Sequence, residues 1–165
     1  VESQRPGPAH RAGSQWYDCR TELRGSRRDP AGYDRTVFNL VAADNQFEKA
    51  FALFLEKAPD VERFSKLSEA FGFTIAYTDS AANLRYYEPD FVAITTDGVH
   101  HLIETKGRED IDVVHKNHAA RLWCENATLL TGVEWHFRIV HQKEFEQLHP
   151  ADFEDLIALE PVELL

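Results

Sequence analysis

The chain has 165 residues, of which 43% are apolar and 12% aromatic, which is enough to bury one compact core. This composition excludes an intrinsically disordered chain, and no apolar run reaches the roughly eighteen residues that a membrane-spanning helix needs. A formal net charge of -10 argues against a domain that clamps nucleic acid by itself, because such affinity comes largely from Lys and Arg meeting phosphates.

The first part of the chain, residues 1–35, is rich in turn-forming residues such as Gly7-Pro8, Gly25-Ser26 and Pro30. It is predicted to be a linker or the edge of an upstream domain. The sequence contains no methionine, so we expect it to be a fragment or an excised domain of a longer protein. The folded domain is then expected to span residues 36–165.

A helix is predicted from Asn45 to Ala58, where Pro59 stops it. Its apolar residues follow the helical spacing: Phe47, Ala50, Phe51, Phe54, Leu55 and Ala58. A half-buried strand is predicted next, from Phe73 to Thr78, because apolar and small polar residues alternate there.

A hairpin follows, with apolar runs on either side of Thr96-Asp97-Gly98. A three-residue loop makes Thr95 face Val99, and the register then puts Asp90 opposite Glu104. Because side chains on a strand alternate between faces, Asp90, Glu104 and Lys106 would project from the same face. A two-residue loop would separate them.

The remaining elements are a helix from Ile111 to about Asn126, a strand from Trp135 to Val140 and a short acidic helix within residues 150–159. Trp123 lies on the apolar stripe of the first of these helices and is predicted to be a core residue. The pattern by itself supports an α/β fold.

The chemistry of the hairpin residues points to phosphodiester hydrolysis. Two carboxylates suit Mg2+ or Mn2+, which bind oxygen ligands and can activate a water. A lysine on the same face can hold that water and neutralise developing negative charge. We expect Asp90 and Lys106 to face a wet cleft. The alternative is a solvated hairpin with a Glu-Lys pair on its wet face.

The residues of the hairpin resemble a known nuclease superfamily. Pro89-Asp90, followed by Glu104-Thr105-Lys106, is similar to the PD-(D/E)xK motif. Flanking segments extend the resemblance to the C-terminal endonuclease domain of the large, helicase-bearing subunit of type III restriction enzymes, over about residues 36–142. These segments are Asn39-Leu40-Val41, Phe47-Glu48-Lys49-Ala50-Phe51, Gly72-Phe73-Thr74-Ile75-Ala76-Tyr77 and Ala119-Ala120-Arg121-Leu122-Trp123-Cys124.

The resemblance implies a restriction-endonuclease-like core, a mixed four-stranded sheet flanked by helices in the order αβββαβ, within a nuclease domain at residues 36–165. It implies a Mg2+-dependent DNA endonuclease, with Mn2+ as an alternative ion. Asp90 and Glu104 would bind the metal, with the Thr105 carbonyl as a third ligand. Lys106 would orient water, and Glu48 would assist.

The resemblance also implies partners and a setting. The partners would be DNA, an upstream helicase domain of the same protein and a methyltransferase or recognition subunit. The protein would be cytoplasmic and prokaryotic and would act in defence against foreign DNA. ATP would act only through the helicase part, because this chain has no G-x-x-x-x-G-K-[ST] phosphate loop.

The sequence leaves two assignments open. Glu48 either approaches the metal site or completes a capping box with Asn45, three residues before it. Arg108, Lys116 and Arg121 follow the motif and either contact phosphates or are ordinary surface charges.

The alternative function is a catalytically inactive nuclease-like module that binds nucleic acid or serves in assembly. Its sign would be the loss of an active-site residue. Asp90, Glu104 and Lys106 are all present, which favours the enzyme.

Overall fold

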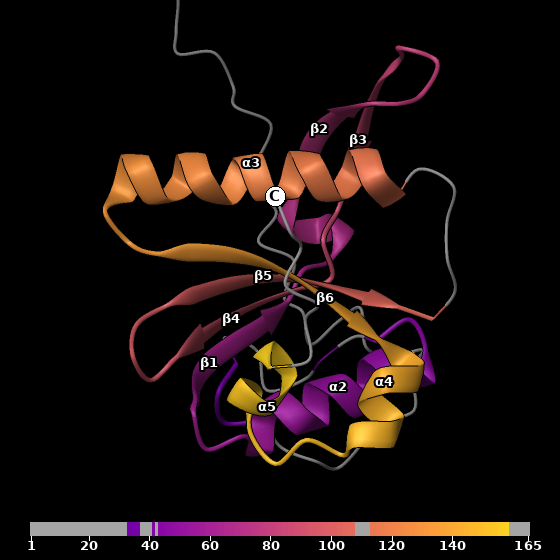
Figure 1. Cartoon of the computed structure of the whole chain (residues 1–165). Helices are drawn as coiled ribbons and strands as arrows, with labels where there is room; N and C mark the ends of the chain where they lie inside the picture. The colour runs from indigo at the N-terminus through magenta and orange to yellow at the C-terminus, as the bar shows by residue number, and fades with distance from the viewer. Residues whose placement is uncertain (1–32, 37–40, 42, 108–112, 159–165) are drawn as a thin grey trace, which may run out of the picture. The chain divides into compact units, whose positions relative to one another are not determined.

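The computed structural model of the chain describes residues 33–36, 41, 43–107 and 113–158 (Figure 1). The chain divides into two units, Val1–Ala31 and Gly32–Leu165, and all the described residues belong to the second. The predicted linker at residues 1–35 therefore lies outside the described residues, apart from residues 33–35.

A four-stranded mixed sheet with the strand order β1-β4-β5-β6 forms the centre of the second unit. Its strands are β1 (Val61–Lys66), β4 (Phe91–Thr95), β5 (His100–Lys106) and β6 (Trp135–His141). The β1–β4 and β4–β5 pairs are antiparallel, whereas β5 and β6 are parallel because a crossover helix joins them. The predicted fold class, a mixed four-stranded sheet flanked by helices, is confirmed.

Helices cover both faces of this sheet, as Figure 1 shows. They are α2 (Gln46–Lys57), α3 (Val113–Thr131), α4 (Gln142–Leu148) and α5 (Phe153–Ile157). One face of the sheet packs against α3, and the other packs against α2, α4 and α5. Because neighbouring residues of a strand point to opposite faces, Leu102 belongs to the α3-side core and Ile103 to the α2-side core.

Helix α2 forms where the sequence predicts it. Its N-cap is Asn45, whose side-chain oxygen accepts a hydrogen bond from the Glu48 amide at 2.9 Å. Phe47, Phe51 and Leu55 are buried on one face of the helix. Its C-cap, Ala58, has a ψ of 120°, as expected of a residue that precedes a proline.

A strand does form within the predicted segment Phe73 to Thr78, but the prediction that it belongs to the main sheet was wrong. Strand β2 (Ile75–Thr78) pairs instead with β3 (Leu84–Tyr87) in a separate two-stranded sheet. The missing first strand is β1, whose burial does not alternate. With β1 in this place, α2, β1, β4, β5, α3 and β6 follow the predicted order αβββαβ.

The hairpin between β4 and β5 has a three-residue loop, the one of the two loop lengths considered that keeps Asp90 and Glu104 on the same face. The Thr95 amide donates to the Val99 carbonyl at 3.0 Å, and Phe91 pairs with Ile103. Gly98 has a φ of +88°, a conformation that other residues rarely adopt. Continuing this register by one pair places Asp90 opposite Glu104.

The C-terminal helices differ from the prediction in length and number. Helix α3 extends to Thr131, and the first two residues of the predicted helix, 111 and 112, lie outside the described residues. Helix α4 was not predicted, because it follows β6 without a turn signal between them. Helix α5 falls within the predicted segment 150–159. Among the described residues, no helix is both long enough and apolar enough to cross a membrane.

Candidate active site

The predicted catalytic residues meet at one end of the main sheet. Asp90 immediately precedes β4, and Glu104 and Lys106 lie in the last three residues of β5. Glu48, in the first turn of α2, and Lys66, the last residue of β1, contact each other at the same end. We refer to Glu48, Lys66, Asp90, Glu104, Thr105 and Lys106 as the strand-end site.

Asp90 is held in position by both of its carboxylate oxygens. Its Oδ2 accepts hydrogen bonds from the Thr105 amide at 2.7 Å and from the Thr105 hydroxyl at 2.6 Å. Its Oδ1 accepts from Lys66 Nζ at 3.1 Å. These bonds fix the orientation of the carboxylate. The amide and hydroxyl of Thr105 therefore orient Asp90. The role of the Thr105 carbonyl as a metal ligand stays a prediction.

Lys66 is a site residue that the sequence reasoning missed. Its Nζ lies 3.0 Å from Glu48 Oε2 as well as 3.1 Å from Asp90 Oδ1, and its side chain is only 7% exposed. Burial alone would lower the pKa of Lys66, but the charges of Asp90 and Glu48 outweigh it and raise the pKa. The ammonium is therefore charged. No motif in the sequence Val61-Glu62-Arg63-Phe64-Ser65-Lys66 distinguishes Lys66 as a site residue.

Glu48 takes part in both of the arrangements that the sequence left open. Its amide donates to Asn45, and its carboxylate accepts from the Asp44 amide at 2.9 Å and from Asn45 Nδ2 at 2.8 Å. The same carboxylate forms the ion pair with Lys66. Helix capping and a place in the strand-end site are thus compatible, and a catalytic role for Glu48 stays a prediction.

Glu104 and Lys106 form a close, mostly buried pair. Lys106 Nζ donates to Glu104 Oε1 at 2.7 Å, and each side chain is 13% exposed. The side chain of Asp90 is 20% exposed, so Asp90 and Lys106 are partly buried, and the expectation that they face a wet cleft stays a prediction. Burial, and then the charge of Asp90, raises the pKa of Glu104.

Two buried side-chain oxygens, one of them in Glu104, lack a hydrogen-bond partner among the described residues. They are Glu104 Oε2 and the hydroxyl of Tyr87, which β3 contributes. Burial and the negative charge of Glu104 raise the pKa of Tyr87, so its hydroxyl stays protonated. Since buried polar groups in native proteins are normally satisfied, these two oxygens can interact with a water, an ion or a substrate.

The family comparison covers this whole arrangement. The family model described as an endonuclease domain matches residues 34–151. The chain belongs to the endonuclease-domain family. The match includes every residue of the strand-end site, and it supports a nuclease and a restriction-endonuclease-like fold. Neither a curated protein nor a solved structure matches the chain.

The endonuclease domain brings one of the three predicted DNA-contacting residues near the site. The positive charge of Lys116, on α3, opposes the rise in the pKa of Glu104, and its Nζ lies 6.0 Å from the centre of the Tyr77 ring. Arg121 is exposed five residues further along α3, about 7–8 Å along the helix axis. Arg108 lies outside the described residues.

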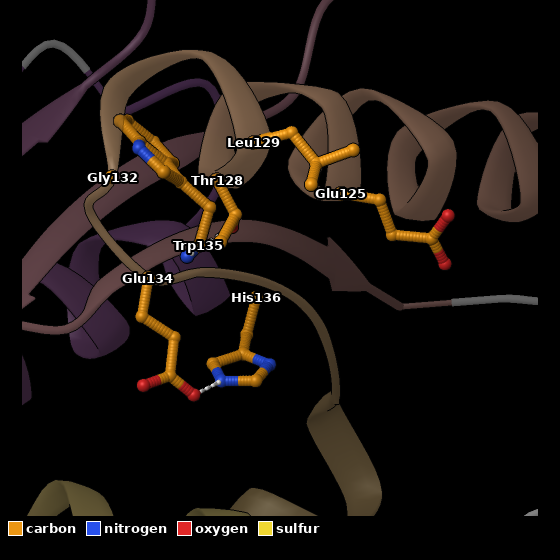
Figure 2. A pocket seen from close by; sticks show the side chains of 7 residues that line it. All are labelled: Glu125, Thr128, Leu129, Gly132, Glu134, Trp135 and His136. Atoms are coloured by element: carbon orange, nitrogen blue, oxygen red, sulfur yellow. Dashed lines mark hydrogen bonds and ion pairs between the residues drawn. The ribbon is translucent and has the colours of Figure 1, made fainter.

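An open pocket of about 620 Å³ lies elsewhere on the endonuclease domain (Figure 2). It is formed by the C-terminal half of α3 and the start of β6, and it shares no residue with the strand-end site. Its lining residues are Glu125, Thr128, Leu129, Gly132, Glu134, Trp135 and His136. The contact drawn there joins Glu134 Oε1 to His136 Nε2 at 2.7 Å.

The donor set of the strand-end site fits a hard cation. Within the described part of the chain, no group of three or more His, Cys, Asp and Glu residues is arranged to hold a metal ion. Mg2+ is usually bound through one or two carboxylates and keeps several waters. Asp90 and Glu104 can supply these two carboxylates, and the unpartnered Glu104 Oε2 is an oxygen available to an ion.

Proposed function

We propose that this endonuclease domain hydrolyses DNA phosphodiester bonds with the help of Mg2+ or Mn2+ and leaves a 5′-phosphate. The observation that carries the proposal is the meeting of Asp90, Glu104 and Lys106 at one end of the β4–β5 pair. The register of the hairpin produces this meeting, and Glu104 Oε2 is buried there without a partner among the described residues.

Asp90 and Glu104 would hold the metal ion, with the Thr105 carbonyl as a third ligand. A divalent ion at such a site lowers the pKa of a bound water and offsets the charge that develops on the phosphoryl oxygens. The raised pKa of Glu104 supports this assignment, because a buried carboxylate beside another carboxylate gains from a nearby cation.

The chain's own residues would position the reactants. The Thr105 amide and hydroxyl keep Asp90 in one orientation. Lys106, 2.7 Å from Glu104 Oε1, lies where its ammonium can hold a water or a phosphate oxygen. In a mostly buried site, such a charge stabilises the transition state more strongly than in bulk water.

The proposal extends to the setting of the domain. By its resemblance to type III restriction enzymes, the domain would be the nuclease part of a larger helicase–nuclease protein, with a methyltransferase or recognition subunit as a further partner. ATP would enter through the helicase part. The setting would be the prokaryotic cytoplasm, and the role would be defence against foreign DNA.

The first experiment measures Mg2+-dependent cleavage of supercoiled DNA by the 165-residue chain at high protein concentration and low salt. We expect Asp90→Asn and Lys106→Met to lose activity by about a hundredfold or more, the usual cost of removing a transition-state contact. Asn replaces Asp90 because it keeps the shape of the side chain, and its one amide oxygen can still accept from Thr105, whereas its NH2 group cannot accept from Lys66. Lys57→Met removes an exposed lysine at the end of α2 and serves as the control.

Circular dichroism checks that each variant is folded. Full activity in either Asp90→Asn or Lys106→Met would contradict the assignment. Metal-independent DNA binding without cleavage would instead favour the inactive nuclease-like module. An RNA of the same sequence, tested in parallel, shows which nucleic acid the domain cuts.

A further inference from the structure

Lys66 occupies a position between carboxylates from two different elements. Its Nζ lies 3.0 Å from Glu48 Oε2, on α2, and 3.1 Å from Asp90 Oδ1, next to β4. A third carboxylate oxygen, Asp44 Oδ2, lies 3.8 Å away. The ammonium thus sits among three acidic side chains, as a metal ion would.

The surroundings keep this ammonium in place. The side chain of Lys66 is 7% exposed, as is that of Glu48, and Nζ lies 5.1 Å from the centre of the Phe91 ring. Lys66 is the residue of β1 that pairs with Phe91 of β4, so the backbone of the sheet fixes where the side chain starts. Reorienting it would leave a buried carboxylate unpaired.

We propose that Lys66 takes the place of a second divalent cation between Glu48 and Asp90, so that each chain binds one metal ion. This inference rests on the proposed metal-dependent function, in which Asp90 and Glu104 hold that ion. Lys66 is then a positioning residue, which acts on the metal site through Asp90.

The charges of the site support a single ion. Glu48, Asp90, Glu104 and the nearby Asp44 are four carboxylates, and Lys66 and Lys106 are two ammonium groups, so two net negative charges remain. One divalent ion balances this excess. A second divalent ion would add two further positive charges beside Lys66 in a mostly buried place, where like charges repel strongly.

The test counts bound ions directly, without an activity measurement. The 165-residue chain is titrated with Mn2+, and the free ion is followed by electron paramagnetic resonance. We expect the unchanged chain to bind one Mn2+. Lys66→Met removes the ammonium and should raise the count to two, whereas Lys66→Arg keeps the charge and should leave it at one.

One further variant is a control, and another tests the position of the new ion. Lys57→Met removes an exposed lysine of α2 and should leave the count at one. Adding Glu48→Gln to Lys66→Met should abolish the second ion, because Gln keeps the shape of the side chain but loses its charge. If Lys66→Met is unstable without metal, Mn2+ should raise its melting temperature more than that of the unchanged chain.

The outcomes separate the two proposals. Two ions in the unchanged chain would overturn the inference about Lys66 and leave the metal-dependent function intact. One ion in Lys66→Met, with no extra stabilisation by Mn2+, would show that Lys66 is only a structural ion-pair partner. No ion in the unchanged chain would overturn the metal-dependent function and the inference together.

Discussion

At the scale of single residues, His101 shows how burial couples this fold to pH. The side chain of His101 is 2% exposed on the α2 side of β5, and its ring lies 4.7 Å from that of Phe153. Burial, together with the nearby charges of Arg138 and His136, lowers the pKa of His101 from 6.5 to about 3. His101 is therefore neutral in the folded protein at neutral pH.

The expected consequence is a loss of stability in acid. Below pH 6.5 the unfolded chain binds a proton at His101 and the folded chain does not, so unfolding becomes easier as the pH falls towards 3. The loss should be about 1.4 kcal/mol for each pH unit in this window. His101→Leu should flatten the pH dependence of the free energy of unfolding, measured by urea denaturation.

The matched control for this prediction is His115→Gln, at an exposed position of α3. It should leave the pH dependence unchanged. An equal slope for His101→Leu and the unchanged chain would contradict the prediction.

Trp123 packs against two aromatic rings on the α3 side of the sheet. Its ring makes edge contacts with Phe73 at 5.1 Å and with Trp135 at 5.2 Å. Its side chain is only partly buried, so Trp123→Ala should lower the free energy of unfolding by about 3 kcal/mol, at the low end of the range for large aromatic residues. Thermal or urea denaturation measures this. A change as small as that of an exposed residue, such as Leu129→Ala, would contradict it.

At the scale of elements, the start of α2 combines a helix cap with a part of the site. Asn45→Ala removes the cap and should lower the free energy of unfolding by about 1 kcal/mol, with little effect on cleavage per folded molecule. Glu48→Gln can keep the cap, because Gln also serves in a capping box, but it loses the charge that faces Lys66. We expect it to reduce cleavage and also to lower the free energy of unfolding by more than Asn45→Ala does, because the buried Lys66 loses a charged partner.

Parallel measurements of urea denaturation and Mg2+-dependent cleavage distinguish the two roles of α2. If Glu48→Gln cut DNA as fast as the unchanged chain, the role of Glu48 would be confined to the cap and the ion pair with Lys66.

At the scale of the whole molecule, an acidic chain must act on an acidic polymer. The chain has 28 acidic residues and 18 Lys and Arg residues, so few phosphate contacts and little counterion release are expected. We expect the isolated 165-residue chain to bind duplex DNA weakly at physiological salt and to cut it slowly. Attachment to a DNA-tracking motor would raise the local concentration of DNA at the site.

The measurement compares cleavage by the isolated chain with cleavage by the full-length protein and ATP, at matched concentration and salt. The full-length protein should be faster without any change at Asp90 or Glu104. Equal rates, together with tight duplex binding by the isolated chain, would show that this domain carries its own DNA recognition.

The sequence by itself determined the local parts of this protein. The turn signal Thr96-Asp97-Gly98 and the apolar runs beside it predicted the hairpin, and the three-residue loop that it has gives the expected register, with Asp90 opposite Glu104. The helical spacing and the Asn45 cap predicted α2. These features depend on residues close together in the chain, so their spacing is enough to predict them.

Only the tertiary structure showed that residues 61–66 form the strand β1, that β2 pairs separately with β3, and that Lys66 lies in the site. The burial of β1 does not alternate, because Ser65 and Lys66 are buried beside Phe64. A buried lysine is favourable only when its counter-charges surround it. For Lys66 these come from Glu48, eighteen residues before it, and from Asp90, twenty-four residues after it. Such partners meet only when the chain folds, so no local pattern could predict them.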